Sequence, residues 1–202
     1  MSRRQRQAEE TRQDILAAAR ALFVEQGYAR AAVADIAERA GVAVQTIYDS
    51  VGSKRALAMA LVETIDEQAA VPDLAAQIAT AAQPEQLIEL HVRITRYIQE
   101  RCGDVVAALE SAAVLEPDVQ AALAEGNRRH RAGAETVAGR LAELGALRAE
   151  LTTTEAASLI EALTSASSRR LLLGNGLSFD AYESLLNRAL QRLLLNERAG
   201  PE

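Results

Sequence analysis

The sequence predicts an all-α protein, and three features of its 202 residues lead to that prediction. Ala and Leu are abundant beside many charged residues, a composition that favours helices. Apolar residues recur at the helical spacing of three and four, and no segment shows the alternation of strands. Apolar residues make up 49% of the chain but aromatic ones only 3%, so the core has to consist of Leu, Ala, Val and Ile.

The composition also indicates the cellular compartment in which the protein works. Cys102 is the single cysteine, which excludes an internal disulfide and a Cys-based zinc site and fits a reducing cytoplasm. The first ten residues have no apolar stretch after their arginines, unlike a secretory signal. No apolar run reaches the roughly 20 residues that a membrane span needs. We therefore expect a cytoplasmic protein that does not associate with a membrane.

The chain begins with a polar segment, residues 1–10, that carries Arg3, Arg4 and Arg6. This segment is either a disordered tail or an arm that reaches DNA phosphates or a minor groove. Apolar residues at helical spacing then predict a first helix over about 11–26, which Gly27 ends.

Residues 33–54 have the spacing of a helix-turn-helix. Ile36 and Ala37 share the inner face of one helix, and Ala37 is small enough for a close helix crossing. Gly41 suits the sharp turn because glycine tolerates a positive φ angle, and Ile47 fills the wedge below the second helix. In such a motif the second helix can lie in a DNA major groove.

Charge is distributed unevenly along the chain. Through residue 57 there are 9 Lys and Arg against 7 Asp and Glu, which leaves 13 against 21 for the remainder. A mildly basic helix-turn-helix domain over 1–52 is therefore expected to precede an acidic helical domain over 53–202.

Cap residues and prolines divide the second domain into helices. Ser53 predicts the start of a helix to about residue 70, and Pro72-Asp73 precedes a short one over about 74–82. Pro84 opens a helix that we expect to end at Gly103-Asp104, where a separate helix over about 105–115 begins.

Similar signals organise the C-terminal part. Pro117 opens a long helix to about Gly145. The capping box of Thr152 and Glu155 starts a helix that we expect to reach about Leu173, and Ser178 starts the last one.

Residues 11–57 resemble the TetR family of bacterial transcription regulators, over the whole of its DNA-binding domain. The motifs that carry the resemblance are Ala21-Leu22-Phe23 before Gly27-Tyr28, Asp35-Ile36-Ala37, Ala40-Gly41-Val42, Thr46-Ile47-Tyr48, and Ser53-Lys54 with Leu57. The resemblance implies a homodimer with an N-terminal helix-turn-helix domain and a C-terminal ligand-binding and dimerisation domain. Its N-terminal domains would bind a near-palindromic double-stranded operator, and a small-molecule effector would release the DNA. Repression is the default in the family, and activation is the alternative.

Several residues are assigned to DNA binding. Val44 and Gln45 open the second motif helix, where Gln45 can form two hydrogen bonds with an adenine and Val44 can contact a thymine methyl. The resemblance implies phosphate or thymine contacts for Thr46 and Tyr48. Lys54 stands where helix amides and its ammonium can share a phosphate, although Lys54 and Tyr48 are also compatible with a solvated surface pair. Arg3 and Arg4 are added from the N-terminal segment.

Some positions depart from the family pattern. Ala31-Ala32 and Ala43 stand where Thr or Ser is common, and Ser50-Val51 replaces an aromatic pair. Alanine cannot cap a helix, and the loss of a cap typically lowers stability by about 1 kcal/mol. These departures leave open a second function, an interaction module whose DNA-binding domain is degenerate.

Candidate effector-binding residues lie on or beside inward-facing apolar stripes. They are the polar or polarisable side chains of His91, Tyr97, Cys102 and His130. Each is equally compatible with a hydrogen-bonded core residue. A pocket lined by Leu, Ala and Val would suit a small apolar or amphipathic effector.

The sequence does not point to an enzyme, a metal site or a cofactor. His91 and Cys102 are eleven residues apart, about 16 Å along one straight helix, and cannot form a nucleophile–base pair there. No Gly-rich phosphate loop, HExxH or GxSxG pattern occurs.

The last two predicted helices are apolar on more than one face. Either the rest of the chain covers this surface, or two copies of the chain pack it together as a homodimer. The apolar residues concerned are Leu159, Ile160, Leu163, Leu171, Leu172, Leu173, Leu185, Leu186, Leu190, Leu193, Leu194 and Leu195.

Overall fold

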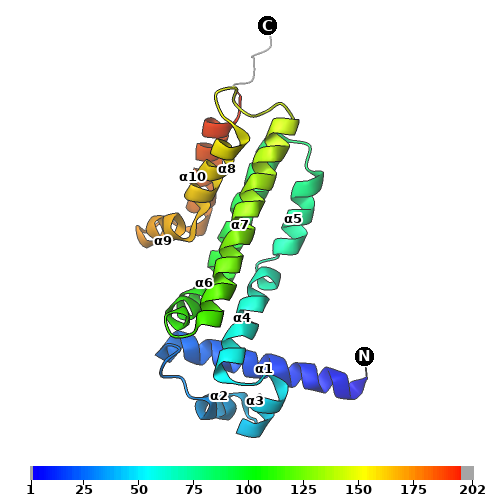
Figure 1. Ribbon diagram of the computed structural model, residues 1–202, viewed down its shortest axis with the longest axis vertical. Helices are drawn as coiled ribbons and strands as arrows, with labels where there is room; N and C mark the ends of the chain where they lie inside the picture. The colour runs from blue at the N-terminus through cyan, green and yellow to red at the C-terminus, as the bar shows by residue number, and fades with distance from the viewer. Residues whose placement is uncertain (1, 197–202) are drawn as a thin grey trace. The chain divides into compact units, whose positions relative to one another are not determined.

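The computed structural model describes residues 2–196, which form ten helices and no strand (Figure 1). The predicted all-α class is therefore confirmed. None of these helices is both long enough and apolar enough to cross a membrane. In chain order the helices are α1 (Arg3–Gln26), α2 (Val33–Ala40), α3 (Val44–Ser50), α4 (Lys54–Gln68), α5 (Val71–Thr80), α6 (Pro84–Ala113), α7 (Pro117–Glu143), α8 (Thr153–Thr164), α9 (Ala166–Gly174) and α10 (Phe179–Leu194).

The chain forms two compact units. One contains Met1–Ile65 and Cys102–Gly126, and the other contains Asp66–Arg101 and Asn127–Glu202. Helices α4, α6 and α7 contribute residues to both units. The first unit thus combines the residues expected for a helix-turn-helix domain, 1–52, with segments from later in the chain.

The helix-turn-helix is present as predicted. Helix α1 contacts both α2 and α3, and the side chains of Ile36 and Ile47 are fully buried between them. Ala37 is buried as well. Gly41 ends α2 with a φ angle of 67°, in the left-handed region that favours glycine. The local spacing is therefore sufficient to specify this motif.

The polar segment at the start of the chain is helical, so the alternative of a disordered tail is wrong, while the alternative of an arm that reaches DNA stays a prediction. Helix α1 begins at Arg3, because Ser2 and Gln5 form a capping box that satisfies the first backbone amides. Residues 3–10 are nonetheless exposed throughout. Arg3, Arg4 and Arg6 therefore lie on the exposed first turns of α1, ahead of the part of this helix that is packed against other helices.

The predicted helix end at Gly103-Asp104 is also wrong. Helix α6 continues to Ala113, with Cys102, Val105 and Leu109 buried. A glycine within a helix lowers its stability by about 1 kcal/mol, but burial of several apolar side chains on the same turns outweighs that loss. Asp104 pairs with Arg20 of α1 at 2.5 Å instead of starting a new helix.

Conversely, the helix expected from Thr153 to about Leu173 is two helices. Helix α8 ends at Thr164, and Ser165 has extended backbone angles and caps α9 through a hydrogen bond from the Ser168 amide. The other start signals are confirmed. Pro84 and Pro117 open α6 and α7, Thr152 and Glu155 form the capping box of α8, and Ser178 caps α10. Helix α5 begins at Val71, with Pro72 inside its first turn rather than before it.

The second unit has its own apolar core, to which α10 contributes Tyr182, Leu186, Leu190 and Leu194. The Tyr182 hydroxyl lies 3.2 Å from that of Thr95 on α6, so its polar end is satisfied inside this core.

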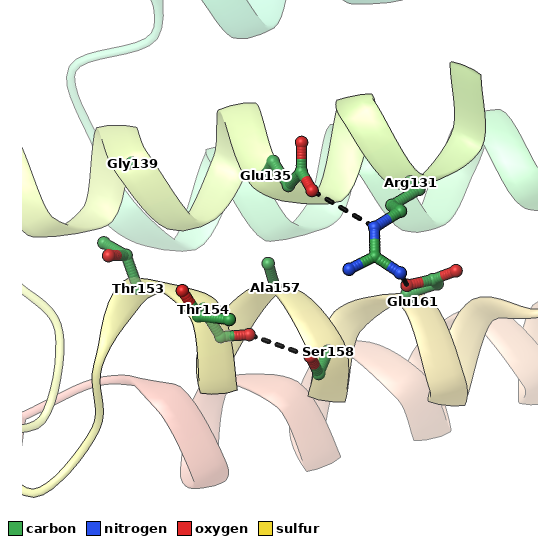
Figure 2. Close-up of a pocket in the computed structure, with 8 residues that line it drawn as sticks. All are labelled: Arg131, Glu135, Gly139, Thr153, Thr154, Ala157, Ser158 and Glu161. Atoms are coloured by element: carbon green, nitrogen blue, oxygen red, sulfur yellow. Dashed lines mark hydrogen bonds and ion pairs between the residues drawn. The ribbon is translucent and has the colours of Figure 1, made fainter. Parts of the chain in front are cut away.

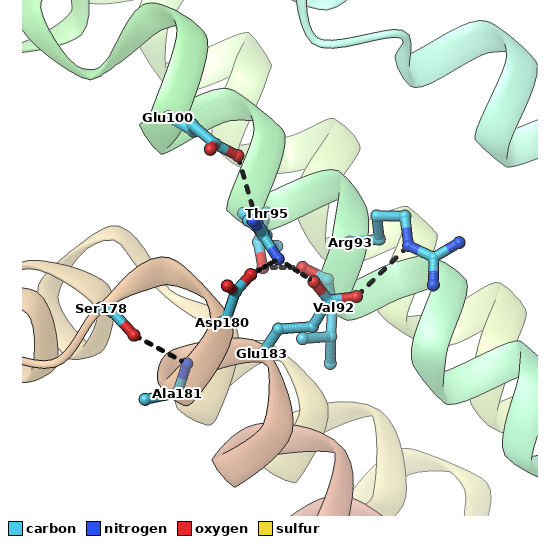
Figure 3. A network of polar contacts seen from close by, with 9 residues as sticks. Val92, Arg93, Thr95, Glu100, Ser178, Asp180, Ala181 and Glu183 are labelled. Carbon is cyan, nitrogen blue, oxygen red and sulfur yellow. Dashed lines mark hydrogen bonds and ion pairs between the residues drawn. The ribbon is translucent and has the colours of Figure 1, made fainter.

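An ion-pair network holds α6 to α10 beside this core (Figure 3). Arg96 contacts Glu183 at 2.6 Å and Asp180 at 2.7 Å on α10, and Glu100 on its own helix at 3.1 Å. Arg93 contacts Glu183 at 3.2 Å. These carboxylates together raise the pKa of Arg96, chiefly through its hydrogen bond with Glu183.

Candidate functional site

The second helix of the motif, α3, presents a polar and partly apolar outer face. Val44 is 40% exposed and Tyr48 is 50% exposed, and the side chain of Gln45 is exposed as well. Ile47 is fully buried and anchors the opposite face. Four of the residues assigned to DNA binding, Val44, Gln45, Tyr48 and the half-buried Thr46, can therefore be reached from solvent.

Gln45 has a partner that the sequence assignment missed. Its amide nitrogen donates to the Asp49 carboxylate at 2.8 Å, one turn later on α3. The spacing of four residues on an exposed helix face is the signal that could have revealed the pair. Because one amide hydrogen is fixed by Asp49, the carbonyl oxygen and the second hydrogen keep a defined orientation toward solvent.

Lys54 is half-buried rather than one member of a solvated surface pair with Tyr48. Its ammonium lies 4.5 Å above the centre of the Tyr28 ring and donates to the carbonyl oxygen of Ala29 at 3.1 Å. Burial lowers the pKa of Lys54, while the nearby Glu116 carboxylate acts in the opposite direction. Ser53 caps the helix that Lys54 begins, through a bond from the Ala56 amide.

Both motif helices lack a side-chain cap, as their sequence predicts. Ala32 precedes α2 and Ala43 precedes α3, each with the extended backbone angles of a capping position but without a capping hydrogen bond. Ala31 is buried instead, so a polar replacement there would enter the core. At the other end of α3, Arg12 donates to the carbonyl oxygen of Ser50 at 3.3 Å.

Replacing Ala43 with serine is expected to stabilise the folded chain by about 1 kcal/mol. The new hydroxyl can accept a hydrogen bond from a backbone amide in the first turn of α3. Thermal unfolding followed by circular dichroism measures the effect. Ala34→Ser is the matched control, since Ala34 is exposed within α2 and not at a cap. Equal melting temperatures for Ala43→Ser and Ala34→Ser would contradict the expectation.

Two of the four effector candidates are brought together in the second unit. His91 of α6 and His130 of α7 stack with ring centres 5.5 Å apart and an angle of 26° between their planes. His91 is 3% exposed. Gly133 lies beside His91, where an added Cβ would be 3.5 Å from the ring, an ordinary van der Waals contact.

Thr164 and Arg169 complete this cluster. The Thr164 hydroxyl donates to the Ile160 carbonyl oxygen at 2.7 Å, so it accepts a hydrogen bond from Nε2 of His130, 2.9 Å away. Nε2 of His91 lies 3.4 Å from the same hydroxyl. Arg169 is 6% exposed and donates to the carbonyl oxygen of Thr164 at 3.4 Å. No local pattern marks Thr164 or Arg169, because their partners lie on other helices.

Burial lowers the pKa values of both histidines. It lowers the pKa of His91 to about 3, and the neighbouring His130 adds to this effect. The pKa of His130 is lowered by burial first and then by Arg169, while Glu161 opposes the change.

Cys102 and Tyr97, the other two effector candidates, do not belong to the cluster of His91 and His130. Cys102 is fully buried in the first unit, where its thiol lies 3.8 Å from the carbonyl oxygen of Ile65. Tyr97 is half-buried, with the Arg101 guanidinium 3.9 Å from its ring centre. Of the four candidates, only His91 and His130 form a cluster.

A groove of about 330 Å³ lies between α7 and α8 (Figure 2). Arg131 reaches across it between two carboxylates, 3.2 Å from Glu135 and 3.4 Å from Glu161. Thr153, Thr154 and Ser158 line the α8 wall, and none of the four effector candidates lines it. Most of its lining side chains are of polar residues, unlike the Leu, Ala and Val expected for the effector pocket.

Most of the apolar residues in the last helices are covered by their own unit. Ile160, Leu186, Leu190 and Leu194 are buried in its core. Three leucines remain exposed, namely Leu171 at 64%, Leu185 at 37% and Leu193 at 44%. In Figure 1, α8 and α10 lie side by side, and both also contact α9.

Comparisons with known proteins agree with this arrangement. Residues 15–61 match the model of bacterial regulatory proteins of the tetR family. No curated protein matches the chain. Solved structures share its fold at low sequence identity, among them the following three.

The first of these is NalD, the secondary repressor of the MexAB-OprM multidrug efflux pump in Pseudomonas aeruginosa, with 20% identity, a TM-score of 0.71 and coverage of 95% of this chain and 99% of NalD. The complex of SmeT with triclosan has 19% identity, a TM-score of 0.74 and coverage of 96% and 98%. The fatty acid degradation regulator FadR from Bacillus halodurans has 18% identity, a TM-score of 0.67 and coverage of 89% and 94%.

Proposed function

We propose that the chain is a ligand-responsive transcriptional repressor, because residues 15–61 match the model of bacterial regulatory proteins of the tetR family and the chain shares the fold of the repressor NalD. In the cytoplasm it binds a palindromic DNA operator as a homodimer. A small-molecule effector releases the protein from the DNA. The observation that carries this proposal is the outer face of α3, where Val44, Gln45 and Tyr48 are exposed on a helix anchored by buried Ile47.

DNA binding is assigned to residues 1–52 together with Lys54. Val44 and Gln45 are assigned to base edges, Thr46 and Tyr48 to phosphates or a thymine, and Lys54 to a phosphate. Arg3 and Arg4 extend the contact along the DNA backbone from the exposed first turn of α1.

Effector binding and dimerisation are assigned to residues 53–202. His91 and His130 form the polar part of the effector site, which favours a small amphipathic ligand over a purely apolar one, since polar groups in a buried cluster select ligands that can satisfy them. Two of the structural neighbours are described as a repressor of an efflux pump and as a complex with triclosan, which supports this class of function. Helices α8–α10 form the dimer contact, where Leu171, Leu185 and Leu193 are exposed.

Lys54→Ala is expected to weaken binding to every duplex by a similar factor, about threefold to tenfold at moderate salt, because a phosphate contact carries no sequence information. The slope of the logarithm of affinity against the logarithm of salt concentration should fall by about one. Fluorescence anisotropy with duplexes selected from a random pool measures both.

Arg30→Ala is the matched control, because it removes an exposed positive charge from the same unit without touching Tyr28. An unchanged salt slope for Lys54→Ala would contradict the phosphate assignment. Failure of the wild-type chain to recover any duplex would instead overturn DNA binding itself and favour the interaction module.

A further inference from the structure

Polar contacts within the first unit join α1, the α1–α2 connection and α4 to the C-terminal part of α6, the α6–α7 junction and the first turn of α7. Each uses one side chain from residues 1–65 and one carboxylate from residues 102–126. The contacts are Arg20 with Asp104 at 2.5 Å, Tyr28 with Glu116 at 2.8 Å, and Arg55 with Asp118 at 2.9 Å.

One of these contacts leads to Lys54. Tyr28 is 3% exposed, and its ring packs edge-on against Phe23 with centres 5.2 Å apart. The Tyr28 hydroxyl donates to Glu116, and the Lys54 ammonium rests on the same ring. Glu116 therefore holds the ring that supports the lysine.

Glu116 is itself fixed by the backbone. Its amide donates to the carbonyl oxygen of Ala112 at the end of α6, and its own carbonyl oxygen accepts from the Gln120 amide in the first turn of α7. The carboxylate thus projects from the junction of two helices, and rigid helix ends position a side chain more accurately than a loop does.

We propose that Glu116 is a positioning residue for DNA binding, which acts through Tyr28 to hold the Lys54 ammonium ready for a phosphate. This inference rests on the proposed function. A free lysine side chain loses rotamer entropy when it is fixed, so a lysine already held against a ring and a carbonyl oxygen loses less on binding. The bond to Ala29 uses one of the three ammonium hydrogens, and the others can reach a phosphate oxygen.

The test compares four variants with wild type for affinity to a duplex selected from a random pool. Glu116→Ala and Tyr28→Phe each remove the hydrogen bond between the Tyr28 hydroxyl and Glu116. Each is expected to weaken DNA binding about threefold to tenfold, Glu116→Ala relative to Glu116→Gln and Tyr28→Phe relative to wild type. Glu116→Gln removes the same charge as Glu116→Ala but retains an acceptor for the Tyr28 hydroxyl, so it should restore the affinity. Asp118→Asn removes an equal charge two residues away, with no effect on Tyr28.

A Lys54→Ala background separates positioning from general support of the fold. There, Glu116→Ala and Glu116→Gln are expected to bind equally, because the residue they position is gone. An equal loss with and without Lys54 would overturn the inference, and so would equal affinities of Glu116→Ala and Glu116→Gln in the wild-type background.

Thermal unfolding checks that each variant is folded, and Tyr28→Phe, which keeps the ring, replaces any glutamate variant that is not. If wild type itself recovers no duplex, the proposed function fails and this inference fails with it. If wild type binds and only the Glu116 comparison fails, the proposed function stands without it.

Discussion

Acidification from pH 8 to pH 5 is expected to destabilise the folded chain by about 2 kcal/mol through His91 alone. The pKa of His91 is lowered to about 3 in the folded chain, against an ordinary value of 6.5. Below pH 6.5 the unfolded chain therefore binds a proton that the folded chain does not. The stabilisation is complete above about pH 6.5 and decreases as the pH falls toward 3.

His130 adds to this loss in the same direction, because its pKa is also lowered. The charged groups beside it are Arg169 and Glu161, which act in opposite senses. The carboxylates with lowered pKa values, such as those of Asp104 and Glu155, titrate at more acidic pH, since their ordinary values are 3.8 and 4.5. Between pH 6.5 and 5, the change in the free energy of unfolding therefore comes mainly from the histidines.

Urea unfolding at half-unit steps from pH 8 to pH 5 measures this effect. In His91→Gln the amide nitrogen can replace Nε2 as a donor to Thr164 but binds no proton, so this variant should lose much of the pH dependence. Proton NMR gives a second measurement, because the His91 ring signals should remain constant over the interval. A His91→Gln variant as sensitive to pH as wild type would show that the destabilisation arises elsewhere.

Gln45→Ala is expected to abolish the preference for adenine at one position in each operator half-site. A glutamine that makes two hydrogen bonds with adenine contributes about 1–3 kcal/mol of discrimination, or about 5- to 150-fold in relative affinity. In the free chain Asp49 holds one amide hydrogen of Gln45, which orients the remaining donor and acceptor before DNA arrives. The loss should therefore appear at a single base pair.

Competition binding with each of the four bases at every operator position measures the change. Asp49→Asn keeps an acceptor for Gln45 and should preserve the preference, whereas Asp49→Ala should relax it in part. If Gln45→Ala weakened all sequences equally, Gln45 would be a backbone contact rather than a base contact.

Much of the fold could be predicted because its determinants are local. Ala37, Gly41 and Ile47 specify the helix-turn-helix within eleven residues, and Gly41 does adopt the positive φ angle that the turn requires. The starts of α6, α7, α8 and α10 follow from a proline or a capping residue at each position. Such signals act over three or four residues and do not depend on the rest of the chain.

Helix ends could be predicted less well, because distant packing competes with local propensity. Gly103 does not end α6, since Cys102, Val105 and Leu109 around it are buried against other parts of the first unit. The break at Ser165 was missed because an apolar stripe continues across it. The helical start of α1 was missed because its capping box stands in a segment without a run of apolar residues.

The sequence by itself determined the all-α class, the helix-turn-helix and the residues on the outer face of α3, because each depends on spacing along one or two helices. Only the tertiary structure showed that His91 and His130, 39 positions apart, stack on each other beside the Thr164 hydroxyl, and that Glu116 and Lys54 both contact Tyr28. Such contacts depend on how helices distant in the chain pack together, and no pattern within a single helix encodes them.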